Sequence, residues 1–344
     1  MAKKETGCDF NAELKKLKNA PPQRIYVLFG EEDYLRDHFL GRLKAKCLPE
    51  GEDGFNFKRF DGPGLDAGEL SKAVDMLPFL SECTFIELRN VDLNKLGEPD
   101  RFIEVLRAVP DYCTVCFVQD AHFEPDGRLK LIKFLKQNSA FLEFIVQGQS
   151  ALYGWIDRRF SALGKTITRD AKERLVLISG DLMNRLIPEI GKIAAYTVGD
   201  TVTAADVEAS ASHIPEAEVF DMINLLSEKK FDAALHILSE LLNNKDNEPI
   251  GILTLISYQL RRIYGVKLAL QSGKKQRDIK TLLNIRWDFA ADRLILSAGR
   301  FTLPQLKRAL TECAETEYRM KSSSAEDKEL LKEYFIHLIL GDAA

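Results

Sequence analysis

The sequence predicts an α/β domain built on a parallel sheet, followed by two all-helical domains. Three observations lead to this prediction. The chain has 344 residues, more than one compact core usually holds, so it should divide into domains. Short apolar runs alternate with helical patterns as far as about residue 146, whereas helical patterns alone follow. We therefore expect domains over residues 1–146, 147–212 and 213–344.

Short runs rich in β-branched and aromatic residues predict the strands of the first domain. These runs are Ile25–Phe29, Phe55–Phe60, Thr84–Leu88, Val115–Val118 and Phe144–Val146. Segments with apolar residues at helical spacing separate them, at Asp33–Cys47, Ala67–Met76, Pro99–Ala108 and Gly127–Lys136. Because parallel sheets bind ligands beyond the carboxyl ends of their strands, the loops after Phe29 and Phe60 should lie at the functional edge.

The second domain carries helix signals and no convincing strand. Thr168 and Asp170 are placed to cap a helix, Gly180 to end one and Thr203 to begin another. We therefore expect residues 147–212 to form a small helical domain.

The third domain is expected to be entirely helical. Residues 212–219, SHIPEAEV, have the turn signals of a linker. From Val219 onward, nearly every segment has apolar residues at positions i, i+3, i+4 and i+7, with Gly, Asn or Pro in the gaps.

Composition excludes several classes of protein. The net charge of −4 gives no overall basic field that would draw the chain onto nucleic acid or an anionic membrane. No apolar run has the length of a membrane-spanning helix or the pattern of a signal peptide, so the cytoplasm is the expected location. Among the six cysteines, Cys113 and Cys116 form a C-x-x-C inside a predicted strand. They are expected to be core residues, because no second pair completes a zinc site.

The turn after the first strand has the setting of a phosphate-binding loop but the wrong residues. P-loops carry G-x-x-x-x-G-K-[ST], whereas Gly30 is followed here by Glu31, Glu32 and Asp33. Carboxylates repel a triphosphate and instead suit the first turn of a helix. Since G-x-G-x-x-G, G-x-S-x-G and histidine pairs at metal-ligand spacing are also absent, we expect no cofactor, no metal and no intrinsic catalytic site.

Six longer strings point to a known family. In chain order they are YVLFGEEDYL, MLPFLSECTFIELRNV, DLMNRLIPEIGKIAAY, VFDMINLLSEKKFDAALHILSELL, LISYQLRRIYGVKLAL and ETEYRMKS. Their order and spacing resemble, over nearly the whole chain, the delta subunits of bacterial DNA polymerase III, which are clamp-loader subunits of the AAA+ class. The resemblance implies an AAA+-like sheet domain without a P-loop, a small helical lid domain and a helical collar domain for oligomerisation.

The resemblance also implies a function. A delta subunit does not hydrolyse ATP; it binds the ring-shaped sliding clamp (beta subunit) and opens it for loading onto primed DNA. The other implied partners are clamp-loader subunits of the gamma/tau and delta prime types and primed DNA reached through the complex, with no membrane. Such a chain has no catalytic site of its own, although it belongs to the polymerase III holoenzyme.

In this family a hydrophobic tip in the first domain inserts into the clamp, and the matching residues here are Met76, Leu77, Phe79 and Leu80 around Pro78. We call these five residues the knuckle. Pro78 prevents an undisturbed helix and favours extended geometry at Leu77. From the residues alone, a place in the core is favoured over an exposed contact. The resemblance reverses that preference and makes Phe79 the first candidate anchor.

Basic residues of the helical domains are candidates for contacts with DNA or with other subunits, although a solvated helix face is the simpler interpretation. They are Arg158, Arg159, Lys165, Arg261, Arg262, Lys274 and Lys275. Two other functions stay open: a nucleotide-dependent AAA+ DNA motor, which needs a phosphate site that the sequence does not offer, and a stand-alone helical DNA-binding protein, against which the net charge counts.

Overall fold

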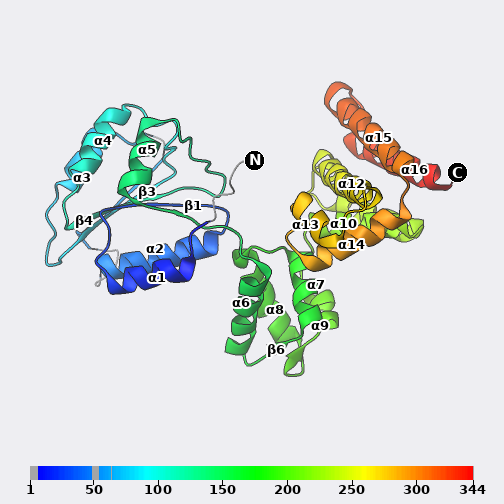
Figure 1. The fold of residues 1–344 in the computed structure, drawn as a ribbon, viewed down its shortest axis with the longest axis horizontal. Coiled ribbons are helices and arrows are strands. Elements are labelled where there is room, and N and C mark those ends of the chain that lie inside the picture. Colours follow the sequence, from blue (N-terminus) through cyan, green and yellow to red (C-terminus); the bar gives the residue numbers. More distant parts are fainter. Residues whose placement is uncertain (1–6, 49–53, 63, 344) are drawn as a thin grey trace. The chain divides into compact units, whose positions relative to one another are not determined.

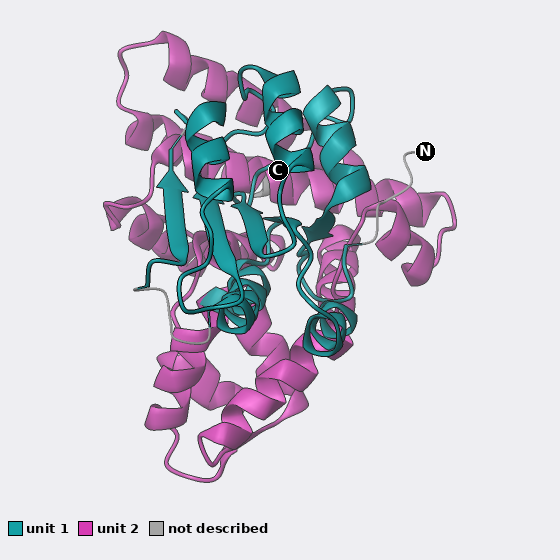
Figure 2. Cartoon of the chain, turned by 90° about the vertical axis from the view of Figure 1, so that its left-hand side faces the viewer, with its two compact units in different colours: residues 1–147, 182–184 teal, residues 148–181, 185–344 magenta. Residues whose placement is uncertain are grey.

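The computed structural model describes residues 7–48, 54–62 and 64–343. The chain divides into two compact units (Figure 2): unit 1 comprises residues 1–147 and 182–184, and unit 2 comprises residues 148–181 and 185–344. We expect no signal peptide at the beginning of the sequence, and residues 1–6 of that segment lie outside the described residues. Among the described residues, no helix has both the length and the apolar content needed to cross a membrane. The expected division into three domains stays a prediction.

Unit 1 is built on a five-stranded sheet in which all neighbouring strands are parallel, in the order β2-β3-β4-β1-β5. The strands are β1 (Ile25–Phe29), β2 (Phe57–Asp61), β3 (Thr84–Arg89), β4 (Cys113–Val118) and β5 (Ala140–Glu143). Strand β1 lies between the central strand β4 and the edge strand β5, and its Val27 pairs with Phe117 on one side and Phe141 on the other. β1 and β4 are buried along their whole length, as expected for a parallel sheet covered on both faces.

Helices cover both faces of this sheet (Figure 1). α1 and α2 lie on one face and α3, α4 and α5 on the other. The helices are α1 (Phe10–Asn19), α2 (Asp33–Cys47), α3 (Ala67–Val74), α4 (Pro99–Arg107) and α5 (Lys130–Asn138). The core between one helical layer and the sheet includes Leu70, Phe102 and Leu135 against Val27 and Phe117.

Two predicted strands were placed wrongly. β2 begins at Phe57, so Phe55 lies in the turn before the strand and is exposed. β5 is Ala140–Glu143 and not Phe144–Val146. Phe144 is buried because its ring packs against Phe39, at a centroid distance of 5.8 Å, after the last paired residue of the strand. The apolar run at Phe144–Val146 therefore indicated burial without locating the paired residues, whereas the run at Phe55–Phe60 indicated neither, because no residue of β2 is buried.

The sequence analysis also missed short elements and shifted some ends. It did not predict α1, a polar helix capped by Asp9 in which Leu17 is the buried residue. Expected helix bounds at Ala67–Met76 and Gly127–Lys136 become Ala67–Val74 and Lys130–Asn138. Propensity defines helix ends poorly because tertiary contacts decide the last turn.

The first part of unit 2 is helical, with one small addition. It contains α6 (Gln149–Ala162), α7 (Arg169–Ser179), α8 (Met183–Tyr196), whose first two residues count with unit 1, and α9 (Ala204–Ser210). Two predicted signals hold, since Gly180 ends α7 with a φ of +85° and Thr203 caps α9. Thr168 precedes α7 without a capping hydrogen bond from its side chain, and Asp170 lies in the first turn of that helix. Two strands of two residues, β6 (Thr166–Ile167) and β7 (Thr201–Val202), pair in parallel and were not predicted, because such short runs lack a measurable alternation.

The second part of unit 2 consists of helices around one core. They are α10 (Pro215–Ser227), α11 (Phe231–Asn243), α12 (Pro249–Gln271), α13 (Gln276–Leu282), α14 (Asp288–Arg300), α15 (Leu303–Ser322) and α16 (Asp327–Ala343). The expected linker at 212–219 is shorter than predicted, because Pro215 occupies the first turn of α10, where its missing N–H costs nothing. The basic candidates Lys274 and Lys275 lie directly before α13, which begins at Gln276. The core joins residues of all seven helices, among them Ile223, Ile256 and Phe335.

Candidate functional site

The turn after β1 requires glycine. Gly30 has a φ of +118°, and a Cβ there would lie 2.3 Å from the Phe144 carbonyl oxygen. The backbone N–H of Glu32 donates to the same carbonyl at 3.0 Å. The turn is thus held tightly against the segment that follows β5.

A carboxylate of this turn takes up a helix N-terminus. Glu32 is fully buried, and its two carboxylate oxygens lie 3.3 and 3.4 Å from the backbone N of Met183, the first residue of α8, which donates to them. Helix N-termini bind anions because their first N–H groups have no partner within the helix. Glu32 is also the N-cap residue of α2, although its side chain makes no capping hydrogen bond there. Asp33 lies in the first turn of α2, where it pairs with Arg36 at 2.7 Å.

The knuckle is an exposed apolar turn between α3 and β3. The exposed fraction is 47% for Met76, 75% for Leu77, 58% for Phe79 and 83% for Leu80. Leu80 has a φ of +53°, a left-handed conformation that costs energy for a branched aliphatic residue. Exposed apolar clusters of this kind on a folded protein indicate a contact surface.

Two neighbouring residues that the sequence analysis did not select belong to this surface. The Asn56 side chain accepts from the Phe79 N–H at 2.6 Å and donates to the Phe79 carbonyl at 2.7 Å. The ring of Phe55, which is 82% exposed, meets the ring of Phe79 edge to face at 5.6 Å between centroids. The sequence pattern around Phe55 predicted a strand. No local sequence signal predicts the contact of Phe55 with Phe79, which lies 24 residues away in the chain.

A cysteine pair lies beside the knuckle. A cavity of about 560 Å³ is lined by Leu80, Asn56, Cys83 and Cys47, among others. The Thr114 hydroxyl lies 3.7 Å from the Cys47 sulfur and 3.9 Å from the Cys83 sulfur. A hydrogen bond from the Cys47 thiol lowers the pKa of Cys83, although partial burial opposes this, and the same bond raises the pKa of Cys47. Cys83 is therefore the candidate reactive thiol of the knuckle region.

We expect N-ethylmaleimide to label Cys83 before the other cysteines. The thiolate is the nucleophile, and burial raises the pKa of Cys113 and of Cys8, in each case to about 11. Peptide mass spectrometry after brief labelling should show a Cys83 rate that rises at lower pH than the rates of Cys8 and Cys113. Cys47→Ala should move this rise to higher pH. Equal labelling of Cys8 at pH 7 would contradict the assignment.

The basic candidates of the first helical segment are largely engaged within the fold. Arg158 is exposed, whereas Arg159 is half-buried over the Trp155 ring, 5.3 Å from its centroid. The Lys165 ammonium donates to the carbonyls of Thr197 and Gly199 at 2.9 and 2.6 Å. Lys165 thus closes the loop beside β6 and β7.

The other basic candidates lie on α12 and just before α13. Arg261 is exposed, and Arg262 lies over the Tyr258 ring at 5.5 Å. Lys274 and Lys275 are exposed next to the start of α13. The seven basic candidates come from α6, α12 and the segments beside α6 and α13, so no single helix carries them all. Their contacts with DNA or with other subunits stay a prediction.

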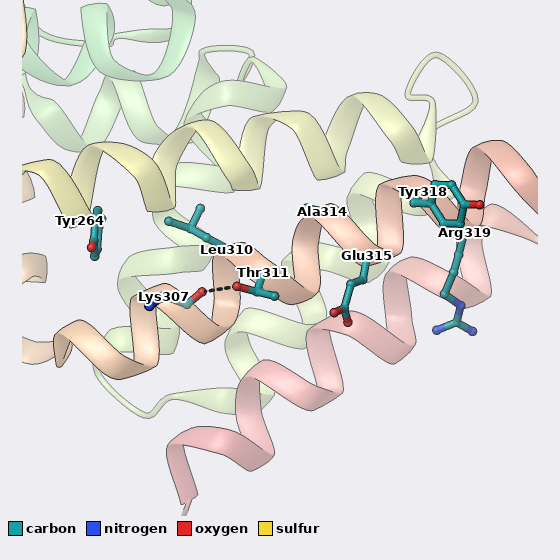
Figure 3. Close-up of a pocket in the computed structure, with 8 residues that line it drawn as sticks. All are labelled: Tyr264, Lys307, Leu310, Thr311, Ala314, Glu315, Tyr318 and Arg319. Atoms are coloured by element: carbon teal, nitrogen blue, oxygen red, sulfur yellow. Dashed lines mark hydrogen bonds between the residues drawn. The ribbon is translucent and has the colours of Figure 1, made fainter.

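A groove of about 790 Å³ runs along α15 beside α12. Figure 3 shows its lining, with Leu310, Ala314 and Tyr318 from α15 and Tyr264 from α12. Tyr318 is 72% exposed, whereas Arg319 pairs with Glu333 of α16 at 2.9 Å. This part of the helical unit offers an apolar face.

A parallel sheet in the order β2-β3-β4-β1-β5 covered by helices, followed by a helical part, defines a mixed α/β and all-α protein in which an acidic turn stands after the first strand. The family model described as "DNA polymerase III, delta subunit" matches residues 26–145, and the one described as "DNA polymerase III delta subunit, C-terminal domain" matches residues 216–339. The chain belongs to the family of DNA polymerase III delta subunits.

Individual relatives agree with this assignment. The DNA polymerase III subunit delta of Bacillus subtilis is 27% identical over 338 residues, which are 95% of each chain. The probable DNA polymerase III subunit delta of Aquifex aeolicus is 26% identical over 78% of each chain. The solved structure of the Bacillus subtilis DNA clamp loader delta protein has a TM-score of 0.57 at 23% identity and covers 96% of this chain and 99% of its own. The predicted fold class is confirmed.

Proposed function

We propose that this chain is a clamp-loader subunit that binds the sliding clamp of the replicase through the knuckle and opens the ring. The observation that carries the proposal is the exposure of Leu77, Phe79 and Leu80 at one turn of a sheet domain. When a partner's pocket covers large apolar side chains that were exposed to water, the free energy falls and the complex is stabilised. Membership of the delta subunit family supplies the identity of that partner.

Ring opening in this proposal needs no bond to be broken in this chain. A ligand that binds the open ring more tightly than the closed ring shifts the population toward the open form by its differential affinity. The acidic turn supports this reading, because Glu32 fills with its own carboxylate the kind of helix N-terminus that commonly holds phosphate. Nucleotide control would then belong to other subunits.

The other proposed partners are the clamp-loader subunits of the gamma/tau and delta prime types, with primed DNA reached through the assembled complex. The apolar face on α12 and α15 supports a subunit contact within residues 213–344. The exposed Arg158, Arg261, Lys274 and Lys275 are the remaining candidates for phosphate contacts.

The test of this function uses the purified chain and the sliding clamp of the same organism. A pair of fluorophores placed across one subunit interface of the ring reports opening. We expect opening when this chain is added, with the same dependence on concentration whether or not ATP is present. Opening that requires ATP would support the motor alternative, and no change in the signal together with salt-dependent binding to duplex DNA would support the stand-alone DNA-binding alternative.

A further inference from the structure

The apolar surface at the knuckle extends beyond the residues that the family pattern supplies. Phe55 comes from the turn before β2, yet its ring contacts Phe79 at 5.6 Å with an interplanar angle of 73°. Both rings remain more than half exposed, so the pair does not bury either one. Two aromatic side chains from separate turns therefore present one continuous apolar surface to solvent.

Asn56 binds the knuckle as a neighbouring strand would. Its side-chain amide pairs with both the N–H and the carbonyl of Phe79, and its own backbone carbonyl accepts from the Phe85 N–H of β3 at 2.8 Å. One residue thus links the exposed turn to the sheet. These bonds hold the Phe79 backbone next to Leu80, whose left-handed conformation needs such support.

We propose that Phe55 is a further contact residue for the sliding clamp and that Asn56 is a positioning residue that holds Phe79 in its binding conformation. This proposal rests on the proposed function. The partner is again the sliding clamp, because the Phe55 ring contacts the Phe79 ring and so extends the apolar surface of the knuckle. Interface residues cluster around a central anchor, and surrounding apolar side chains exclude water from it.

The energetic reasons for the two residues differ. Phe55 adds apolar area that the partner can cover and keeps an edge-to-face contact with the anchor. Asn56 touches Phe79 through its backbone, and it lowers the cost of ordering the turn when the partner binds. Loss of Phe55 should therefore remove contact, whereas loss of Asn56 should remove preorganisation.

The experiment measures the Kd of the full chain for immobilised sliding clamp by surface binding. We expect Phe55→Ala and Asn56→Ala each to weaken binding by about tenfold, and Asn56→Asp, which keeps the acceptor for the Phe79 N–H but loses the donor, to weaken it less. Phe55→Leu should retain most of the affinity if apolar area is what matters. Tyr196→Ala, which truncates a 54% exposed aromatic residue of α8, is the matched control and should leave Kd unchanged.

Coupling separates positioning from a general structural effect. If Asn56 acts through Phe79, then Asn56→Ala should have little further effect in a Phe79→Ala background, and hydrogen exchange of the Phe79 amide should accelerate in Asn56→Ala without change in β3. Additive losses, or faster exchange throughout the sheet, would overturn the role of Asn56. Full affinity of Phe55→Ala beside a weakened Phe79→Ala would overturn the role of Phe55 alone, whereas full affinity of Phe79→Ala would instead remove the knuckle from the proposed function.

Discussion

Replacing Phe79 by alanine is expected to weaken binding to the sliding clamp by about 2 kcal/mol or more, which is about 30-fold in Kd. The ring is exposed in the free chain, so its truncation should cost folding little and affect mainly the complex. Because the loss is one of contact, it should appear mostly in the dissociation rate. Surface binding with immobilised clamp measures both rates.

Two controls make this expectation sharp. Thermal unfolding of the variant should match that of the parent chain closely, because Phe79 is more than half exposed and does not belong to the hydrophobic core of unit 1. Leu17→Ala, which truncates a buried residue of α1 remote in sequence from the knuckle, should show the reverse pattern, with lower stability and unchanged affinity per folded molecule. Clamp affinity equal to that of the parent chain would exclude Phe79 from the contact.

The knuckle illustrates what the sequence could and could not predict. Pro78 and the large side chains around it mark a break after a helix, and α3 does end before them, although at Val74 and not at the expected Met76. Whether these side chains face the core or the solvent depends on the space left between α3 and β3, which no local pattern encodes. The family resemblance predicted that the knuckle side chains are exposed, and they are exposed in the structure. The support from Asn56 is a long-range contact and had no signal of its own.

The partners of charged residues could not be predicted from the sequence either. The acidic turn was evident from Glu31 to Asp33, but only the folded chain brings Glu32 to the N–H of Met183, 151 positions away. Lys165 looked like a member of a surface cluster, whereas its ammonium is used by two carbonyls of a neighbouring loop. Sequence thus predicted charge and periodicity well, and partners across the fold poorly.

A charged triad inside the sheet of unit 1 escaped the sequence analysis in the same way. Glu87 lies in the middle of β3 and is fully buried. Its carboxylate pairs with Lys44 of α2 and Arg89 of β3, and the Lys44 ammonium also lies 4.9 Å from the centroid of the Phe57 ring. Burial would raise the pKa of Glu87, but Arg89 and Lys44 outweigh it and lower that pKa below its ordinary value.

Replacing Glu87 by glutamine is expected to destabilise unit 1 by about 3 kcal/mol or more, since removal of one partner of a buried ion pair leaves charge in the interior without compensation. The substitution preserves volume, so the loss reports charge and not packing. Hydrogen exchange of the β3 and β4 amides in the full chain measures the free energy of opening for this unit alone. Adding Lys44→Met should recover part of the loss, because an apolar side chain of similar length then replaces the buried ammonium.

The same triad predicts a pH dependence with a definite sign. Because the pKa of Glu87 is lower in the folded chain than its ordinary value of 4.5, its contribution to stability is present above pH 4.5 and is lost as the pH falls through the folded-state pKa. The difference in opening free energy between the parent chain and Glu87→Gln should therefore shrink on acidification. Glu317→Ala, which breaks the exposed pair with Lys321, should show no measurable difference at any pH. A Glu87→Gln effect that stays constant below pH 4.5 would mean that the carboxylate is not what the triad stabilises.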